Sequence, residues 1–411
     1  MLAFTSSGLC AMIMLLGCLM LAQLVAAVDN LGSVLESQSN LTTFTKLVKD
    51  HPDILLQLPS EDGVTIIAPS DKAFENIPYT SLNEIWDPED SVKTLALLQY
   101  HVLKKAVDTG SLNTGPTYLE TTLLTDPAYT NVTSGQTILF NKQPGGDIAL
   151  TSGMGTRCTV IEKDIVFPGG LIQITDNLLV PPALLSKTTQ SFQSQSFLAS
   201  LYAAKVMPDI DYKKNITVFV PKDEALQAVA GTLESFDVAK LARVVNYHIV
   251  PDRVIASAML TNGSILETMA KDATGASNER LTVRQAGNNK FVNSAQIVQP
   301  DILIANGIMH LISGVLNPDD DTAVPNPSIA TQAPVFPISS AEHPFTSALP
   351  CSEDCPVTAS TASTQASAST TTTTSVSSKT SDGAAALTRC TAHVAGAAMG
   401  MLGVGVGMAW L

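Results

Sequence analysis

The stretch PDILIANGIMHLISGVLNP, residues 300–318, decides the fold that we predict for this chain. Two apolar runs flank Asn306 and Gly307, and Asn-Gly between apolar runs is the strongest short-range signal of a β-hairpin. An earlier stretch, KDIVFPGGLIQITDNLLVPP at residues 163–182, has the same layout, with Gly170 at the place of Gly307. A hairpin pattern that occurs twice indicates two copies of one domain.

Two further blocks repeat in the same order before each hairpin. VTIIAPSDKAF at residues 64–74 returns as ITVFVPKDEAL at residues 216–226, and each predicts a short buried strand, a break at proline and the start of a helix. The pair Tyr100-His101 closes one helical pattern, and Tyr247-His248 closes its counterpart. Because helical patterns precede strand-like runs in each copy, the order favours an α+β fold with antiparallel strands.

The spacing of apolar residues also places individual elements. It predicts helices over 41–48, 91–103 and 238–248, and Ser70 or Asp71 is available to cap the helix that follows residue 69. Strand-like runs separated by turn residues lie at 137–140, 148–151, 158–161, 171–175, 281–283 and 291–298.

The three blocks, found twice in the same order, resemble those of the fasciclin-like domain family. The resemblance covers about residues 29–182 and 190–318, and NGIMHLISGVLNP at residues 306–318 matches the family's second box closely. It implies a wedge of β-strands packed with helices in each domain, and a role in adhesion or in the organisation of a matrix or wall. We therefore predict two tandem fasciclin-like domains, at residues 28–186 and 187–318.

The resemblance also suggests candidate adhesion residues. In animal members an Asp-Ile pair just before the second box is tied to integrin binding, and Asp164-Ile165 and Asp301-Ile302 resemble that pair. The alternative interpretation is that each Asp is a turn residue and each Ile a core residue at the entrance of a strand.

Both copies depart from the family's second box. The first copy keeps the Asp of the box as Asp176 but has Gln173 where the family has His. The second keeps the His as His310 but has Ser313 where the family has Asp. If that His and Asp acted together, neither copy would be complete, so a structural role that tolerates substitution fits better.

The two ends of the chain carry targeting signals. Residues 1–27 are apolar and uncharged and end in small residues, which predicts a cleaved signal peptide, with an uncleaved membrane anchor as the alternative. Residues 394–411 are also uncharged, and the small residues Ser381, Asp382 and Gly383 precede them across a short polar spacer. This combination predicts attachment of a glycosylphosphatidylinositol (GPI) anchor at Gly383 and removal of residues 384–411, with a membrane-spanning tail as the alternative.

The segment between the domains and the predicted anchor is rich in Pro, Ser and Thr. We predict that residues 319–383 form a disordered, O-glycosylated stalk, with a bare flexible linker as the alternative. Signal, tandem domains, stalk and lipid tail together resemble fungal GPI-anchored proteins with two fasciclin domains.

Cysteines and sequons agree with a secreted chain. Cys351 and Cys355 are close enough for a local disulfide, and Cys158 reads as a buried apolar residue, with an interchain disulfide as the alternative. Sequons for N-glycosylation begin at Asn40, Asn131, Asn215 and Asn262.

Other classes of function find little support. The net charge of −14 is spread without a block, so nucleic-acid binding is not expected. His101 and His248 follow apolar helical positions, which is typical of structural core histidines more than of acid-base catalysts. Motifs for metal binding or nucleophilic catalysis are absent from the sequence, so we expect no enzyme activity, metal or cofactor; a hydrolase would need a triad that the sequence does not show.

The sequence therefore predicts a GPI-anchored glycoprotein on the outer face of the plasma membrane or in the cell wall. It would mediate cell adhesion or contact with a matrix through its fasciclin pair. Its partners would be surface, matrix or wall proteins or glycans, including further copies of itself through homophilic contact. A structural role in the wall without a specific protein ligand is the alternative.

Overall fold

The computed structural model describes residues 31–59, 63–80, 82–83, 86–272, 274–320 and 323–350. The predicted signal peptide, Cys351, Cys355 and the predicted anchor site Gly383 lie outside these residues. Within the described part, no helix is long and apolar enough to cross a membrane.

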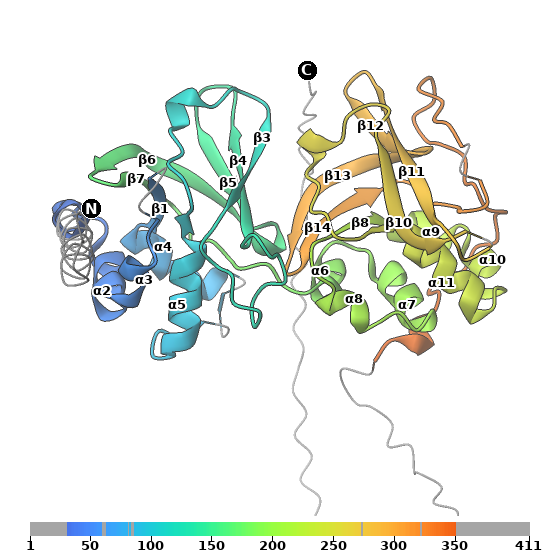
Figure 1. Ribbon diagram of the computed structural model, residues 1–411, viewed down its shortest axis with the longest axis horizontal. Coiled ribbons are helices and arrows are strands. Elements are labelled where there is room, and N and C mark those ends of the chain that lie inside the picture. Colours follow the sequence, from blue (N-terminus) through green and yellow to red (C-terminus); the bar gives the residue numbers. More distant parts are fainter. Residues whose placement is uncertain are drawn as a thin grey trace, which may run out of the picture. The chain divides into compact units, whose positions relative to one another are not determined.

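The described residues form two domains of the same design, each a mixed sheet with helices gathered along one side (Figure 1). In the first domain residues 31–37 are helical. The helices that follow are α2 (Thr42–Asp50), α3 (Asp53–Leu56), α4 (Asp71–Glu75), η1 (Ile77–Tyr79), α5 (Ser91–Tyr100), η2 (Thr109–Ser111) and η3 (Gly153–Gly155). Its strands are β1 (Val64–Pro69), β2 (Val102–Leu103), β3 (Thr117–Thr121), β4 (Thr137–Lys142), β5 (Ile148–Thr151), β6 (Arg157–Phe167) and β7 (Gly170–Thr175).

The second domain repeats this order of elements. Its helices are α6 (Leu185–Ser191), α7 (Gln195–Ala203), α8 (Asp209–Tyr212), α9 (Asp223–Gln227), α10 (Ala230–Glu234), α11 (Val238–Tyr247), η4 (Ser257–Met259) and η5 (Thr346–Ala348). Its strands are β8 (Ile216–Pro221), β9 (Ile249–Val250), β10 (Ile265–Lys271), β11 (Asn278–Ala286), β12 (Asn289–Val292), β13 (Ala295–Ile304) and β14 (Gly307–Ile312).

The two sheets have equivalent strand orders. The first runs β2-β1-β7-β6-β5-β4-β3, and the second runs β9-β8-β14-β13-β12-β11-β10. The pairs β1–β7 and β8–β14 are parallel, whereas all other named pairs are antiparallel. The sequence predicted antiparallel strands throughout, and this one parallel pair per domain is a correction. It arises because the strand of the first box lies beside the last strand of the hairpin, far along the chain.

The strands β1 and β8, each second from one edge of its sheet, are buried along their whole length. Alternate residues of a strand point to opposite faces. In β1, Ile66 packs with the helices α2 and α3, while Ile67 packs on the other face with Tyr100 and Phe140. A strand covered on both faces has the continuous apolar sequence that the first box shows in each copy.

Gly170 and Gly307 are required by the parallel pairing. Each begins the last strand of its hairpin, and a Cβ atom there would overlap the carbonyl oxygen of Val64 or of Ile216 on the neighbouring strand. The connection between β13 and β14 is therefore Ala305–Asn306, and Gly307 already belongs to the strand. The Asn-Gly signal located the hairpin correctly, but the glycine serves close packing of strands.

The first box positions two helices at once. Ser70 caps α4 by accepting a hydrogen bond from the Ala73 amide at 3.3 Å. Asp71 instead accepts the Thr43 amide at 2.7 Å, at the N-terminus of α2. Its counterpart Asp223 accepts the amide of Ser196, near the start of α7, at 2.8 Å. A carboxylate at a helix N-terminus is favourable both as a hydrogen-bond acceptor and as a charge.

Two predicted boundaries differ from the structure. The helix expected over 91–103 ends at Tyr100, and Val102–Leu103 forms β2 beside β1. Residues 323–350, which were expected to belong to the stalk, instead pack on the second domain. There Phe336 is buried against the second core, and Ser339 exchanges backbone hydrogen bonds with Gly231 and Ala228 at 2.8 and 3.1 Å. We call residues 323–350 the strap.

Candidate functional site

The two Asp-Ile pairs occupy the same structural position, a bulge in the long strand before each hairpin. Pairing shifts register between Glu162 and Ile165 in β6, and between Gln299 and Ile302 in β13. Asp164 and Asp301 adopt left-handed backbone angles there, with φ of 59° and 61°. Asp tolerates this conformation better than most residues, because its short polar side chain can bond locally.

Both carboxylates bind the domain's own backbone. Oδ1 of Asp164 accepts the Thr109 amide at 3.0 Å, at the start of η2, and Oδ2 accepts the Thr109 hydroxyl at 2.5 Å. In the second domain Asp301 accepts the Ser257 amide at 2.6 Å and also the Ser257 hydroxyl, at the start of η4. Burial alone would raise the pKa of Asp164, but hydrogen bonds from Thr109 and Gln173 lower it below the ordinary value.

Gln173 and His310 perform the same task in the two copies. Nδ1 of His310 accepts the amide of Asp301 at 3.1 Å, and Nε2 lies 2.9 Å from the Ile255 carbonyl oxygen, to which it donates. Oε1 of Gln173 accepts the amide of Asp164 at 3.0 Å, and Nε2 donates to the Val107 carbonyl oxygen at 3.2 Å. Glutamine therefore reproduces the acceptor and the donor of a neutral imidazole.

The second departure from the family pattern is compensated in the same way. Asp176 accepts the Thr159 amide at 2.6 Å through its carboxylate. Ser313 accepts the Gln296 amide at 3.0 Å through its hydroxyl. Both side chains join the last strand of the hairpin to the preceding long strand. The substitutions leave both networks complete.

The candidate adhesion residues are thus partly internal. Asp301 and Ile302 are 7% and 4% exposed, and Ile165 is half-buried. This geometry favours the interpretation of each pair as a turn residue followed by a core residue. A ligand in contact with these motifs would reach the flanking residues more easily than the carboxylates.

The Tyr-His pairs join the C-terminal end of a helix, α5 in the first domain and α11 in the second, to the neighbouring strands and loops. Nδ1 of His101 lies 2.8 Å from the Leu97 oxygen, and Nε2 accepts the Leu179 amide at 2.9 Å. His248 repeats both contacts at the same distances, with Val244 and Leu316. Burial lowers the pKa of each histidine to about 4, so both rings are neutral.

The tyrosines complete this connection. The Tyr100 hydroxyl donates to the Thr137 oxygen at 3.0 Å, and the Tyr247 hydroxyl donates to the Arg280 oxygen at 2.8 Å. The four side chains are at most 1% exposed, and their contacts are structural.

The hairpin tip of the second domain contacts the first domain, which sequence reasoning missed. Both domains belong to one compact unit. The Ala305 oxygen accepts the Asn131 amide at 2.8 Å and the Thr130 hydroxyl at 3.0 Å. Nε2 of the fully buried Gln136 donates to the Ile304 and Ala305 oxygens at 3.2 and 3.3 Å. Beside these bonds Leu303 packs against Leu139.

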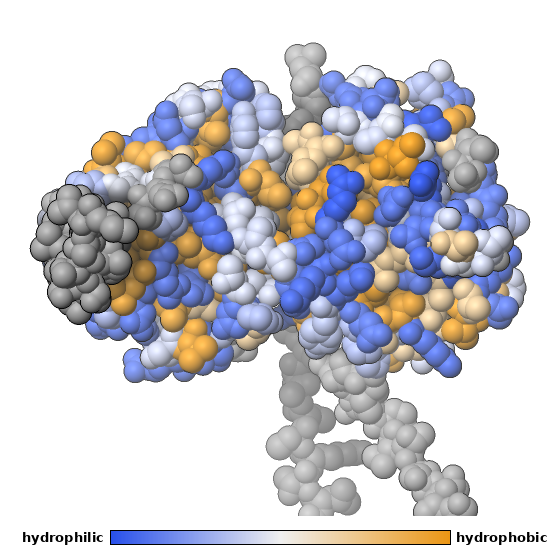
Figure 2. Space-filling view, viewed as in Figure 1, coloured by the Kyte–Doolittle hydropathy of each residue, from blue (hydrophilic) through white to orange (hydrophobic). Residues whose placement is uncertain are grey.

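The same hairpin face is open in the first domain. Val166, the counterpart of Leu303, is 73% exposed, whereas Leu303 is 1% exposed. Ile161, earlier in β6, is 51% exposed, and Glu162 and Lys163 between them are exposed too. On the side of the molecule seen in Figure 2, apolar and hydrophilic residues are likewise interspersed. Because the bulge of the first domain lies beside exposed apolar residues, it is the more accessible of the two.

The sequons differ in their surroundings. Asn262 is exposed, and Asn40, Asn131 and Asn215 are half-buried. The Asn40 amide nitrogen donates to Glu162 at 2.8 Å, and that of Asn215 donates to the Thr133 hydroxyl at 2.6 Å. Asn215 therefore bonds the threonine of the Asn131 sequon across the two domains.

Cys158 is buried and reduced, with its sulfur 3.4 Å from the Leu178 oxygen, and burial raises the pKa of its thiol. Among the described residues, no three His, Cys, Asp or Glu side chains gather in a way that could hold a metal ion.

Comparison with known proteins explains the repeated design. The family model for the fasciclin domain matches residues 39–181 and again residues 192–318. The chain belongs to the fasciclin family. The tandem fasciclin domains predicted from the repeated blocks are confirmed, with an α+β fold in each.

Similar proteins come from fungi and animals. A fasciclin-like arabinogalactan protein of Arthroderma benhamiae is 27% identical, covering 76% of this chain and 72% of that protein. The fasciclin-like arabinogalactan protein elcF of Phaeosphaeria nodorum is 28% identical, covering 73% and 92%. Human periostin is 24% identical, covering 67% of this chain and 31% of periostin. A solved FAS1 domain pair from the insect cell adhesion molecule fasciclin I is 19% identical, covers 69% of this chain and 98% of that chain, and has a TM-score of 0.33.

Proposed function

We propose that this fasciclin protein is a cell-surface adhesion protein without enzyme activity, whose contact surface is the open hairpin face of the first domain. Val166 on β6 marks this face, and the exposed Ile161 and Lys163 precede it in the same strand. The single observation that carries the proposal is the difference between two equivalent residues, Val166 at 73% exposure and Leu303 at 1%. The second domain uses this part of its fold for the contact with the first domain, whereas no described residue covers Val166 in the same way.

The physical character of the face suits a specific but reversible contact. Exposed apolar side chains supply area to be buried, at roughly 25 cal/mol per Å². The nearby exposed Lys163 would add charge pairing, which contributes orientation and specificity. The half-buried Asp164 would act indirectly, since its carboxylate fixes the bulge that presents these neighbours.

The targeting signals support a surface location. We infer that residues 1–27 direct secretion, that a GPI anchor at Gly383 holds the protein on the outer membrane face or in the wall, and that glycosylated residues after the strap form the stalk. Fungal relatives that are called fasciclin-like arabinogalactan proteins agree with a surface glycoprotein. Release of the intact protein from cells by phosphatidylinositol-specific phospholipase C would test the anchor, and retention on the membrane would contradict it.

The adhesion surface is tested by Val166→Glu in cells that display the full chain. The change places a charge on an exposed side chain, so surface display and the unfolding midpoint should stay unchanged. Adhesion of these cells to one another and to β-glucan- or chitin-coated plates should fall severalfold. Ile338→Glu is the matched control, because Ile338 in the strap is 72% exposed.

Two outcomes would refute this assignment. One is unchanged adhesion of Val166→Glu cells at normal display, which would favour the structural wall role without a specific protein ligand. The other is an equal loss with Ile338→Glu, which would show that any added surface charge suffices. Asp164→Ala tests whether the Asp-Ile motif binds the ligand directly. If Asp164 only supports the bulge, the variant should lose adhesion only to the extent that the first domain loses stability.

A further inference from the structure

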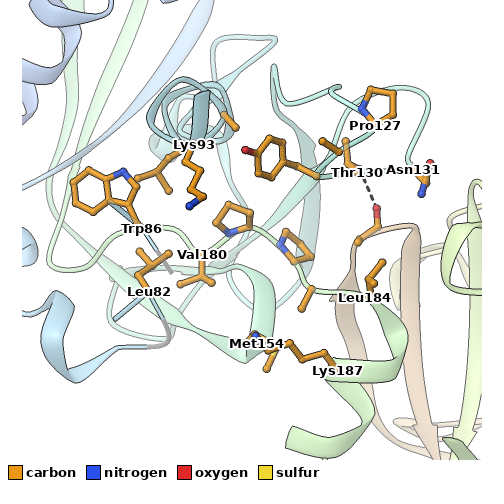
Figure 3. A pocket seen from close by; sticks show the side chains of 18 of the residues that line it. Leu82, Trp86, Lys93, Pro127, Thr130, Asn131, Met154, Val180, Leu184 and Lys187 are labelled. Carbon is orange, nitrogen blue, oxygen red and sulfur yellow. Dashed lines mark hydrogen bonds between the residues drawn. The ribbon is translucent and has the colours of Figure 1, made fainter. Parts of the chain in front are cut away.

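An apolar cavity of about 450 Å³ lies where the first domain meets the start of the second (Figure 3). Trp86 and Leu82 line one end, and Leu184 and Asn131 line another part of the wall. Ligand sites for small molecules typically have volumes of about 300–1,000 Å³ and predominantly apolar walls, and they often occur between domains. The adhesion face does not include this cavity, whereas the hairpin-tip contacts of Thr130, Asn131 and Ala305 form part of its wall.

The walls are held in place before any ligand arrives. The Trp86 indole nitrogen donates to the Thr94 hydroxyl at 3.1 Å, which fixes the ring. Thr130 and Asn131 form hydrogen bonds with Ala305 of the hairpin tip, and these bonds hold Ala305 in the cavity wall. Pro181 and Pro182 stiffen the lining segment between the domains. A preorganised cavity loses little conformational entropy on binding.

The charged side chains that line the cavity, among the described residues, have one sign. Lys93 of α5 and Lys187 of α6 are lining residues, and no described lining residue is acidic. Lys93 pairs with Asp90 at 3.1 Å, outside the lining, whereas Lys187 is exposed and has no ion pair among the described residues. In Figure 3 the Lys93 side chain extends from its helix among the apolar lining groups. An apolar cavity with two lysines and no acidic residue among its described lining residues complements a molecule with an apolar body and one negative charge.

We propose that this cavity binds a long-chain fatty acid, with the chain between Trp86 and Leu184 and the carboxylate at Lys187. Chain burial supplies most of the affinity, because each buried CH₂ contributes about 0.8 kcal/mol. The lysine supplies preference for an acid over a neutral lipid. An aliphatic chain also fits the curved lining formed by the side chains of Leu82, Val180 and Leu184.

The test uses energy transfer from Trp86 to cis-parinaric acid, a fluorescent fatty acid. The second tryptophan, Trp410, is removed by Trp410→Phe so that only Trp86 emits. We expect saturable energy transfer in the full-length protein, displaced by oleate and much less by methyl oleate. Lys187→Gln should weaken binding of the acid about fivefold, the usual upper effect of one exposed charge pair. Lys46→Gln is the matched control, because Lys46 is an exposed lysine of α2 outside the cavity.

A second variant fills the cavity. Ala183→Phe adds a ring to a lining residue and should abolish energy transfer while the unfolding midpoint is retained. If that variant does not fold, two comparisons still test the proposal: Lys187→Gln against Lys46→Gln, and displacement by oleate against displacement by methyl oleate. Absence of saturable transfer would overturn the site, as would equal weakening by Lys187→Gln and Lys46→Gln. Equal displacement by oleate and methyl oleate would overturn the assignment to an acid.

Discussion

Replacement of Gln173 tests whether the bulge network is structural and whether an amide and an imidazole are interchangeable within it. Gln173→Leu keeps the approximate volume but removes the hydrogen bonds to the Asp164 amide, the Val107 oxygen and the Asp164 carboxylate, at 3.0, 3.2 and 2.8 Å. Gln173 is fully buried, so water cannot replace these bonds. With about 1–3 kcal/mol for each backbone group left unpaired, we expect a loss of about 3 kcal/mol of unfolding free energy in the first domain.

Gln173→His is the matched variant, because it imports the side chain that the second domain uses at the same position. The ring should accept the Asp164 amide and donate to the Val107 oxygen, as His310 does with Asp301 and Ile255. The cost should stay within about 1 kcal/mol, the usual range for a well-fitting core exchange.

Urea unfolding followed by Trp86 fluorescence measures both variants, in a Trp410→Phe background, because Trp86 then reports on the first domain alone. With a slope of about 2 kcal/mol per M, the leucine variant should unfold at a midpoint about 1.5 M lower. A leucine variant as stable as the parent would refute the structural role of the network. A histidine variant as unstable as the leucine variant would refute the equivalence of the two side chains.

Three further expectations follow from the same structure. Burial lowers the pKa of His101 and His248 to about 4 from the ordinary 6.5. Each domain should therefore be fully stable above pH 6.5 and lose stability as the pH falls toward 4. The loss should reach up to about 3 kcal/mol of unfolding free energy per domain. Urea midpoints measured between pH 7 and pH 4.5 check this, and a flat profile would contradict it. Gln136→Leu should remove the bonds to the hairpin tip, cost about 2 kcal/mol and separate the two domains into distinct calorimetric transitions, whereas an unchanged transition would count against a coupled pair. Phe336→Ala should release the strap and destabilise the second domain by about 3 kcal/mol while the Trp86 transition stays in place, and faster hydrogen exchange in α9 and α10 would locate the effect.

The sequence was sufficient for the repeat, the fold class and many elements, because these depend on local periodicity. The continuous apolar runs in β1 and β8 marked strands covered on both faces, and the spacing before His248 marked α11. The partner of each strand was less evident. The parallel pairing of β1 with β7 is reflected only in Gly170, whose missing Cβ leaves room for Val64.

The remaining errors concern contacts between residues that are distant in the chain. The strap was read as stalk because its average composition is poor in apolar residues, yet one aromatic side chain, Phe336, finds a place in the second core. Likewise, nothing near Ala305 in the sequence indicates that its carbonyl oxygen accepts bonds from Thr130 and Asn131. Gln173 and Ser313 depart from the family's sequence pattern, which specifies residue types. The fold at these positions requires only hydrogen-bonding groups in the right places, and Gln173 and Ser313 supply them.

The contact at the hairpin tip has a consequence for biosynthesis. Gln136 and Leu139 are synthesised well before Leu303 and Ala305, which cover them in the finished protein. While the ribosome makes the second domain, the first domain therefore exposes an apolar edge to which chaperones can bind. A first domain expressed alone would keep that edge permanently and should be retained or aggregate more than the pair. Burial of this edge is thereby linked to completion of the second domain.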